Sequence, residues 1–558
     1  MGCVKSKPIY DGQNKANNVK DDPSTIVVGC EEDEFSTTDV DRSRNRNYGS
    51  DESATSEAIR TSSRTILSDL MTSIHKMPSY ELGNNCVDIV TANVAHISNI
   101  YEGVEDGPIL GYGISGVVRK VKHRETGAEF ACKPLPLDKI ETEEGLDQLK
   151  EELGILMQLD HPNIVKLEGV YEAEDQIFLI QELLNGGDLF DHLDVQPEEH
   201  YSEAQCAKVV KQMLSAVRYI HSKGIIHRDL KLENFLFNDK SPNSELKMID
   251  FGLSKHFSKD GTKHHEPVGT RYTVAPEVIL GNYDEKVDVW AIGVITFLLL
   301  SGEAPFGGCY EGESPLEIKR KILNAEYSFE PVEYWNHVSS EAKSFIRHIL
   351  VPNPLKRPDA ASCQNHQWLQ EFNSHNEKPL SINVQRAMTK FRGFSDMRKL
   401  LCEVIGFTLM PDQIMELRKE FEKLDVHQTG EISLDGLKQV LCKKSNEFRY
   451  TEEECEEIFD SMRLHGQTTI HWHHFLAAGL SECHIDDTNH RLAFDKIDTE
   501  KKGYITFDDI VDVTGALALD RRVHSLQKEF RANIDIDMDV DEKVYFEDFV
   551  RIMKNVEN

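Results

Sequence analysis

Five polar residues have types and an order along the chain that could transfer a phosphoryl group. A lysine can hold nucleotide phosphates, a helical carboxylate can orient that lysine, and a second carboxylate can accept a proton from an attacking hydroxyl. An asparagine and a third carboxylate supply oxygen ligands of the kind that Mg²⁺ prefers. In that order the residues are Lys133, Glu152, Asp229, Asn234 and Asp250. A lone Asp is usually a cap and a lone Lys a surface charge, so the inference rests on their joint order.

A glycine-rich segment precedes the lysine. It reads Leu110, Gly111, Tyr112, Gly113, Ile114, Ser115, Gly116, Val117, Val118, and contains the pattern G-x-G-x-x-G, which dinucleotide-binding folds share. In those folds a helix follows the glycines, whereas here a strand, a turn and a second strand lead to Lys133. Because glycine lets the backbone approach closely, such a hairpin can fold over nucleotide phosphates. We therefore predict that this segment and Lys133 bind ATP.

The remaining motifs follow in a set order. They are His227-Arg228-Asp229-Leu230-Lys231-Leu232-Glu233-Asn234, then Asp250-Phe251-Gly252, then Ala275-Pro276-Glu277. Together with the glycine loop they resemble the eukaryotic protein kinase superfamily. The resemblance implies a bilobal α+β kinase domain over residues 104–368, with Mg²⁺ held by Asn234 and Asp250. It also implies ATP contacts from the hinge residues Glu182 and Leu184 and from Asp188. No member of the polar set is missing, which disfavours a degenerate pseudokinase.

Several positions indicate substrate class and control. Lys231, two residues after Asp229, resembles the lysine that serine/threonine kinases carry at this position. We therefore include Lys231 in the predicted catalytic set. Asp188 and Glu233 resemble the acidic positions that bind an arginine upstream of the phosphorylated residue. Glu266 stands where many kinases phosphorylate a threonine, so it could pair with Arg228 as a permanent partial mimic of phosphate, or be only an exposed loop glutamate. Gln181, before the hinge, is an unusual gatekeeper that should restrict the back pocket.

Composition excludes several classes of protein. A chain of 558 residues is too long for a single hydrophobic core, so we expect two or three folded domains. A net charge of -33 with no basic patch argues against nucleic-acid binding. Eleven cysteines without C-x-x-C spacing fit a reducing cytosol better than disulfides or a zinc ribbon. The apolar stretch from Val294 to Leu300 is too short to span a bilayer and predicts a buried helix. The N-terminus has no apolar region typical of a secretory signal.

The chain outside the kinase domain divides into three parts. Residues 1–103 form an extension that is polar and predicted to be disordered from Asp11 to about Met77, with no clear role for the stretch that follows. Residues 369–410 form a linker with a basic amphipathic helix near Ser381 to Phe407, whose apolar residues suit a partner groove or, alternatively, a membrane surface. Residues 411–558 contain a fourfold repeat with loops that begin at Asp425, Arg463, Asp498 and Asp537.

The repeats resemble EF-hands, and the order kinase, basic junction and EF-hands is similar to the calcium-dependent protein kinases of plants and protists. That resemblance implies an all-α EF-hand module after the kinase fold. A calcium loop needs oxygen ligands at positions 1, 3, 5 and 12 and a carbonyl at position 7. The first loop lacks the closing carboxylate, and the second has arginine and histidines at ligand positions. The third, with Asp498, Glu500 and Asp509, is a weak candidate because Lys502 is at position 5.

The fourth loop keeps the carboxylates. Its predicted calcium ligands are Asp537, Asp539, Asp541, Asp548 and the carbonyl of Lys543. The family implies that the junction helix blocks the kinase at low calcium and is withdrawn when the module binds the ion. The alternatives are a calcium-insensitive kinase with a structural EF-hand module, or a calcium-binding scaffold. A zinc site at the histidines 465, 471, 473 and 474 is a minor hypothesis.

The first residues match a lipidation pattern. Gly2 would be myristoylated after removal of Met1, and Ser6 is at the position that the pattern requires. Because one acyl chain binds membranes only marginally, Cys3 is a plausible palmitoylation site that would add the second signal. We therefore expect the protein at the cytoplasmic face of a membrane and in the cytoplasm, where it acts on protein substrates with ATP, Mg²⁺ and Ca²⁺.

Overall fold

The structure is a computed structural model of the chain. It describes residues 88–91, 94–113, 116–137, 142–173, 176–257, 263–309, 312–372, 379–443, 448, 450–463, 467–499, 501–513, 527–528, 530 and 543–557. The lipidation residues Gly2 and Cys3 and the loop-4 residues Asp537, Asp539 and Asp541 lie outside the described residues. So do Ile114, Ser115 and Glu500.

The first lobe is a twisted sheet with one long helix. The strand order is β1-β6-β7-β5-β4-β2, and β3 also pairs with β4. The strands are β1 (Asp88–Thr91), β2 (Tyr101–Glu102), β3 (Ile109–Gly113), β4 (Gly116–His123), β5 (Glu129–Pro136), β6 (Leu167–Glu172) and β7 (Gln176–Glu182). The helix α4 (Glu143–Gln158) begins where the Thr142 side chain accepts a hydrogen bond from the Gly145 N–H. Its apolar residues enter the kinase core.

The stretch before the kinase domain, for which the sequence indicated no role, is part of this lobe. Strand β1 pairs in parallel with β6, so it extends the sheet by one edge strand. The short helix α3 (Val94–Ile100) follows, and Ile97 and Tyr101 are buried against β4 and β5 in a separate apolar cluster. This segment therefore adds an edge strand and an apolar contact to the first lobe.

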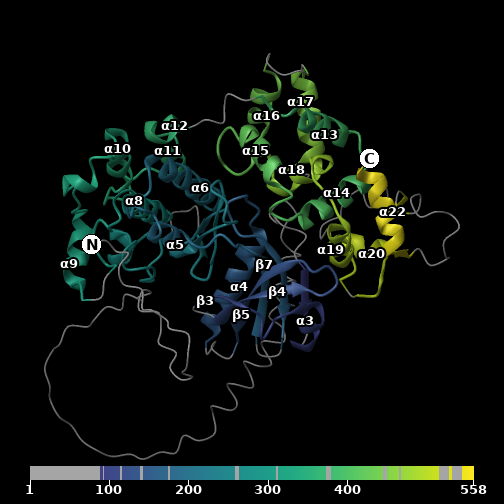
Figure 1. The fold of residues 1–558 in the computed structure, drawn as a ribbon, viewed down its shortest axis with the longest axis horizontal. Helices are drawn as coiled ribbons and strands as arrows, with labels where there is room; N and C mark the ends of the chain where they lie inside the picture. Colours follow the sequence, from purple (N-terminus) through teal and green to yellow (C-terminus); the bar gives the residue numbers. More distant parts are fainter. Residues whose placement is uncertain are drawn as a thin grey trace, which may run out of the picture.

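The second lobe is mainly helical (Figure 1). Its helices are α5 (Leu189–Asp194), α6 (Glu203–Ser222), α7 (Pro276–Ile279), α8 (Lys286–Ser301), α9 (Pro315–Asn324), α10 (Ser340–Ile349), α11 (Ala360–Gln364) and α12 (Gln367–Glu371). Its short strands are β8 (Ile225–Ile226), β9 (Phe235–Phe237), β10 (Leu246–Met248) and β11 (Lys255–His256). Helix α8 is buried on every side, as the sequence predicted for Val294 to Leu300. Among the described residues, no helix has the length and apolar character needed to cross a membrane.

The C-terminal module is helical apart from two short two-stranded ladders. Its helices are α13 (Ile382–Arg392), α14 (Asp396–Thr408), α15 (Met415–Leu424), α16 (Leu434–Leu441), α17 (Glu452–Met462), α18 (Trp472–Ala478), α19 (Asp487–Ile497), α20 (Phe507–Val513) and α22 (Phe546–Glu557). Strand β12 (Ile432–Ser433) pairs with β13 (Thr469–Ile470), and β14 (Tyr504–Ile505) pairs with β15 (Val544–Tyr545). The four repeats therefore form two pairs, the arrangement expected of EF-hands.

The junction segment belongs to this module in the structure. Helix α13 packs on α17 and α18, and α14 packs on α18, α19 and α22. The apolar residues Val384, Met388 and Phe391, which the sequence assigned to one face, are buried in the core of the module. The partner groove of the amphipathic helix is thus the EF-hand module itself, and the autoinhibitory role of this helix stays a prediction.

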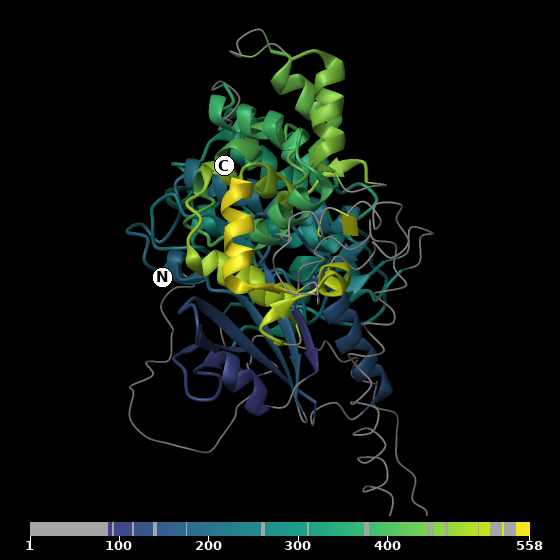
Figure 2. The same ribbon diagram turned by 90° about the vertical axis from the view of Figure 1, so that its right-hand side faces the viewer.

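The module lies beside both lobes of the kinase domain. In Figure 1 its green and yellow helices are on the right, next to β7 and β4. Figure 2 looks at the molecule from that side, and shows the module in front of the teal helices and above the blue strands. The α+β kinase fold followed by an all-α EF-hand module is the fold class that the sequence predicted.

Candidate active site and its regulatory module

Strand β5 brings Lys133 to two carboxylates. The Lys133 ammonium donates a 2.7 Å hydrogen bond to Asp250 Oδ1 and lies 3.5 Å from Glu152 Oε1. Glu152 comes from α4, which places its carboxylate against the sheet, and Asp250 follows β10. The sequence predicted both partners, and the structure brings them to the same ammonium. Such a bridge holds the helix against the sheet, the arrangement needed for phosphate binding.

Burial and charge set the ionisation of this cluster. Burial lowers the pKa of Lys133, but Asp250 and Glu152 outweigh it, so the net pKa is raised and the ammonium stays charged. Burial would raise the pKa of Asp250, yet Lys133 holds it at about 2. Burial raises the pKa of Glu152, and Lys133 only partly offsets this. Asp250 is therefore an anion at neutral pH, as a magnesium ligand must be.

The catalytic loop surrounds Asp229 with hydrogen-bond donors. Thr270 Oγ1 donates to Asp229 Oδ1 at 2.6 Å, and the Lys231 ammonium lies 3.4 Å from Asp229 Oδ2. The Asn234 Nδ2 donates to the Asp229 carbonyl at 2.8 Å. The Ile249 N–H donates to the Asn234 carbonyl at 2.9 Å. Because Ile249 directly precedes Asp250, this hydrogen bond connects the two segments that carry the predicted magnesium ligands Asn234 and Asp250. The predicted catalytic set is thus assembled in one place.

A buried aspartate that sequence reasoning did not single out positions the loop. Asp288 at the start of α8 accepts hydrogen bonds from the N–H groups of His227 and Arg228, both at 2.9 Å, and lies 2.9 Å from His221 Nε2. The Phe251 ring is buried 5.1 Å from the His227 ring. The sequence motifs do not identify Asp288 as the anchor of this loop, because its hydrogen bonds join parts of the chain that are far apart in sequence.

The nucleotide-binding residues differ in what their side chains do. Strands β3 and β4 form the hairpin of the glycine loop, with Gly113 opposite Gly116, and the exposed Tyr112 lies near its tip. The buried Glu182 carboxylate accepts a 2.6 Å hydrogen bond from Lys247. The Glu182 side chain is therefore engaged by another part of the kinase domain. The Asp188 carboxylate caps α5, accepting from the Asp191 N–H at 2.6 Å.

The donor set fits Mg-ATP. Asn234 and Asp250 offer an amide oxygen and an ionised carboxylate, which are hard ligands suited to Mg²⁺. Lys133 offers a charged ammonium beside them, which suits phosphate oxygens. Lys133 lies on β5, which pairs with β4 of the glycine hairpin.

The activation segment is held by ion pairs. Glu266 Oε2 lies 3.5 Å from Arg228 Nη1, as predicted, and Glu266 Oε1 lies 2.6 Å from Lys255 Nζ. Burial would raise the pKa of Glu266, but the hydrogen bond from Lys255 and the charges of Lys255 and Arg228 lower it to about 2. Deeper in the lobe, the buried Glu277 pairs with Arg357 at 2.5 Å. A carboxylate therefore lies beside Arg228, which is the contact that the sequence predicted for a partial mimic of phosphate.

The EF-hand loops differ in how their first carboxylate is used. In the first loop, Asp425 accepts hydrogen bonds from the N–H groups of Thr429 and Gly430 at 2.9 and 2.7 Å. In the second, Arg463 donates to the Gln467 carbonyl at 2.8 Å, so a guanidinium occupies the first ligand position. In the fourth, Lys543 and Asp548 are described, and Asp548 pairs with Arg551 at 2.9 Å.

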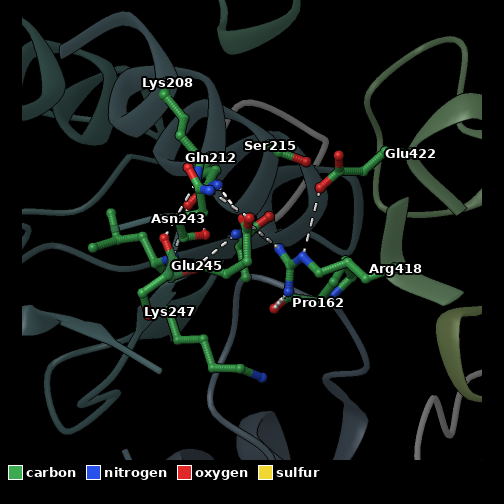
Figure 3. A network of polar contacts seen from close by, with 12 residues as sticks. Pro162, Lys208, Gln212, Ser215, Asn243, Glu245, Lys247, Arg418 and Glu422 are labelled. Atoms are coloured by element: carbon green, nitrogen blue, oxygen red, sulfur yellow. Dashed lines mark hydrogen bonds and ion pairs between the residues drawn. The ribbon is translucent and has the colours of Figure 1, made fainter. Parts of the chain in front are cut away.

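The module contacts the kinase domain through polar groups that the sequence did not reveal. Arg418 on α15 donates to the Pro162 carbonyl at 2.7 Å and lies 3.5 Å from Glu245 (Figure 3). The first loop offers its carbonyls to the helical lobe: Arg218 binds His427, and Gln364 donates to Gln428 at 2.9 Å. These contacts join segments that are far apart in sequence, so no local pattern could predict them.

Comparisons with known proteins agree with this geometry. Residues 104–369 match the family described as "Protein kinase domain". The fold and the matched family define a protein kinase with a bilobal domain.

The relatives extend over the regulatory half as well. The chain is 33% identical over 452 residues to calcium-dependent protein kinase 9 of Arabidopsis thaliana, covering 80% of this chain and 81% of that protein. It is 34% identical over 451 residues to calcium-dependent protein kinase 15 of Oryza sativa subsp. japonica, with coverage of 80% and 81%. The chain therefore belongs to the calcium-dependent protein kinases, a family of ATP-dependent serine/threonine protein kinases regulated through a C-terminal EF-hand module.

Proposed function

We propose that this kinase transfers the γ-phosphoryl group of ATP to serine or threonine residues that follow an upstream arginine, under calcium control exerted mainly through the fourth EF-hand loop. The observation that carries the catalytic part is the bridge from Lys133 to Asp250 and Glu152, next to an Asp229 whose carboxylate is oriented by Thr270. It is the arrangement of a kinase ready to bind nucleotide.

The residues of the chain have distinct tasks in this reaction. Bound Mg²⁺ neutralises charge on the phosphates, and Asn234 and Asp250 would hold it. Lys133 positions the phosphates, and Glu152 keeps Lys133 in place. Asp229 orients the substrate hydroxyl and accepts its proton, and the Lys231 ammonium lies 3.4 Å from that carboxylate. The test is phosphorylation of serine and threonine peptides with Mg-ATP, which should be lost in Asp229→Asn.

Two carboxylates support the preference for an upstream arginine. Tyr272 OH donates a 3.2 Å hydrogen bond to Glu233 Oε2. Burial raises the pKa of Glu233 and the charge of Asp188 raises it further, while Lys231 and the Tyr272 hydroxyl partly offset them. A further cation beside Glu233 and Asp188 would be attracted by both charges. A guanidinium from the substrate supplies that cation and two parallel donors. A peptide library should show an upstream arginine preference in the wild type and lose it in Glu233→Gln with little loss of activity on arginine-free peptides.

Calcium control rests on the surviving ligands of the fourth loop. Asp537, Asp539 and Asp541 lie outside the described residues. Lys543 directly precedes β15, which pairs with β14 of the third loop, and Asp548 lies in α22. An ion bound there would act through α22, which packs on α14 and α19. Excess EGTA should lower phosphorylation by the full-length protein, and Asp537→Ala should remove the response. Unchanged rates in EGTA would favour the calcium-insensitive alternative.

Membrane attachment is proposed from the N-terminal sequence alone. Myristate on Gly2 with palmitate on Cys3 would provide the two signals that stable binding requires. The protein would then work at the cytoplasmic face of a membrane. Labelled myristate should enter the wild type but not Gly2→Ala, and labelled palmitate should enter the wild type but not Cys3→Ser.

A further inference from the structure

The third EF-hand loop contains an ammonium at the place where a calcium loop has its ion. Lys502, at loop position 5, lies with its Nζ 2.5 Å from Oδ1 of Asp509, the residue at position 12. The Asp509 side chain is only 7% exposed and that of Lys502 is 23% exposed, so the pair is largely removed from water. Positions 5 and 12 are two of the positions whose oxygen atoms bind calcium in an EF-hand loop.

Two carboxylates that the structure describes in this loop also accept hydrogen bonds from the protein itself. Asp498 at position 1 accepts hydrogen bonds from the N–H groups of Lys502 and Gly503, at 2.9 and 2.7 Å. The second oxygen of Asp509 accepts from the Thr506 N–H at 2.6 Å and the Thr506 hydroxyl at 2.7 Å. Hydrogen bonds therefore hold positions 1 and 12 of the loop, and the ion pair joins position 5 to position 12.

We propose that the Lys502 ammonium is the resident cation of the third loop, and holds this EF-hand in its closed-loop form without calcium. A calcium ion could enter only by displacing an ammonium that is bound to a largely buried carboxylate. Removing one partner of such a pair leaves a charge without compensation, which is unfavourable. The third loop is therefore a structural element and not a calcium sensor, which removes the weaker calcium candidate formed by Asp498, Glu500 and Asp509.

The lysine also bears on how the module meets the kinase. Helix α19, directly before this loop, carries four residues onto the sheet of the first lobe. Arg491 lies 2.6 Å from Glu125, Asp495 lies 3.7 Å from His123, and Lys496 donates to the Glu168 carbonyl at 3.1 Å. Leu492 is buried in the apolar cluster of that lobe. Because the Lys502 ammonium is part of the chain, it keeps α19 in position at all calcium concentrations.

The same lysine prepares the fourth loop. Strand β14 of the third loop pairs with β15 of the fourth, with Tyr504 opposite Tyr545 and Ile505 opposite Val544. A third loop that is already ordered lowers the entropy that the fourth must lose on binding. This inference does not depend on the fourth loop binding calcium, since it concerns the third loop only.

The experiment uses the full-length protein carrying Asp537→Ala, so that the fourth loop does not contribute. Calcium binding is measured by calorimetry, and hydrogen exchange by mass spectrometry over residues 487–513. With Lys502 intact, we expect no calcium bound at the third loop and the same protection in EGTA and in calcium. Adding Lys502→Asp should create one calcium site and make protection of this segment depend on calcium. Lys419→Asp, the same charge change on an exposed face of α15, should do neither.

A second variant guards against misfolding of the first. Lys502→Met removes the ammonium without adding a carboxylate, and exchange in residues 487–513 should become about tenfold faster whether or not calcium is present. The proposal is overturned if the Asp537→Ala protein still binds calcium and Asp498→Asn abolishes that binding. It is equally overturned if Lys502→Met leaves the protection of the segment unchanged.

Discussion

His473 Nδ1 of the EF-hand module lies 2.6 Å from Asp160 Oδ2 of the kinase domain, and the His473 N–H donates to the same oxygen at 3.1 Å. Asp160 directly follows Leu159, the C-cap residue of α4, and α4 is the helix that carries Glu152. Arg418 binds Pro162 two residues further on. The module thus fixes the turn that connects the catalytic helix to β6, so its docking is linked to the position of Glu152.

This pair predicts a pH dependence of docking. Burial lowers the pKa of His473, but Asp160 outweighs it and the net pKa is raised; burial raises the pKa of Asp160, but His473 lowers it overall. A raised histidine pKa contributes stability that is complete below the ordinary imidazole pKa of about 6.5 and is lost as pH rises through the folded value. Thermal unfolding should therefore show the docked module weakening as pH rises from about 6.5.

The matched variant is Asp160→Asn. It should lower the stability of the docked module by about 3 kcal/mol and abolish that pH dependence, because the histidine then loses its anion. His161 and His471, whose burial lowers their pKa values to about 3 and about 4, titrate far below this range. A pH profile that persists in Asp160→Asn would contradict the assignment.

Gly430 in the first EF-hand loop should be essential for docking. Its φ is +75°, and a Cβ there would lie 1.8 Å from the His161 ring of the kinase domain. Gly430→Ala should therefore separate the module from the kinase, seen as faster proteolysis of the 373–378 linker. Gly503→Ala is the control, because that glycine holds the equivalent position of the third loop with φ +80° and no atom within 4 Å of its Cβ site. Equal effects of both changes would show that backbone strain, not the contact, is responsible.

Asp229→Asn should reduce the rate of phosphoryl transfer by about 10²–10⁴-fold while Mg-ATP binding persists. Asparagine can keep the hydrogen bond from Thr270 but cannot accept the substrate proton. Lys133→Met should instead weaken nucleotide binding and release Glu152. Single-turnover kinetics and thermal shifts with Mg-ATP separate the two effects. Full loss of nucleotide binding in Asp229→Asn would contradict the roles assigned here.

Glu266→Gln should lower activity by up to about fivefold, since the ion pairs that it removes are partly exposed and worth at most about 1 kcal/mol. The folded pKa of Glu266 is lowered to about 2. The stabilising contribution of Glu266 is therefore present above the ordinary carboxyl pKa and is lost as pH falls to the folded pKa. Activity at neutral pH should not need activation-loop phosphorylation, and phosphatase treatment should leave the wild-type rate unchanged. Glu285→Gln, with the same loss of charge outside this ion-pair cluster, is the control.

The catalytic centre could be predicted residue by residue because phosphoryl transfer requires particular side chains, in an order that local motifs preserve. The glycine loop, Lys133, Glu152, Asp229, Asn234 and Asp250 were all readable in this way. The buried helix α8 was also predictable, since a run of apolar residues of that length has no other stable place.

The sequence by itself thus determined the chemistry and the class of each module, because both depend on residue types at fixed local spacings. Only the tertiary structure decided what the degenerate loops do. The junction helices lie inside the EF-hand module, the first loop binds Arg218 and lies against His161 of the kinase, and Lys502 pairs with Asp509. These outcomes depend on which distant surfaces pack together, and on whether a lysine turns into its own loop or toward water. Packing brings these distant residues together, and no short sequence pattern predicts such contacts.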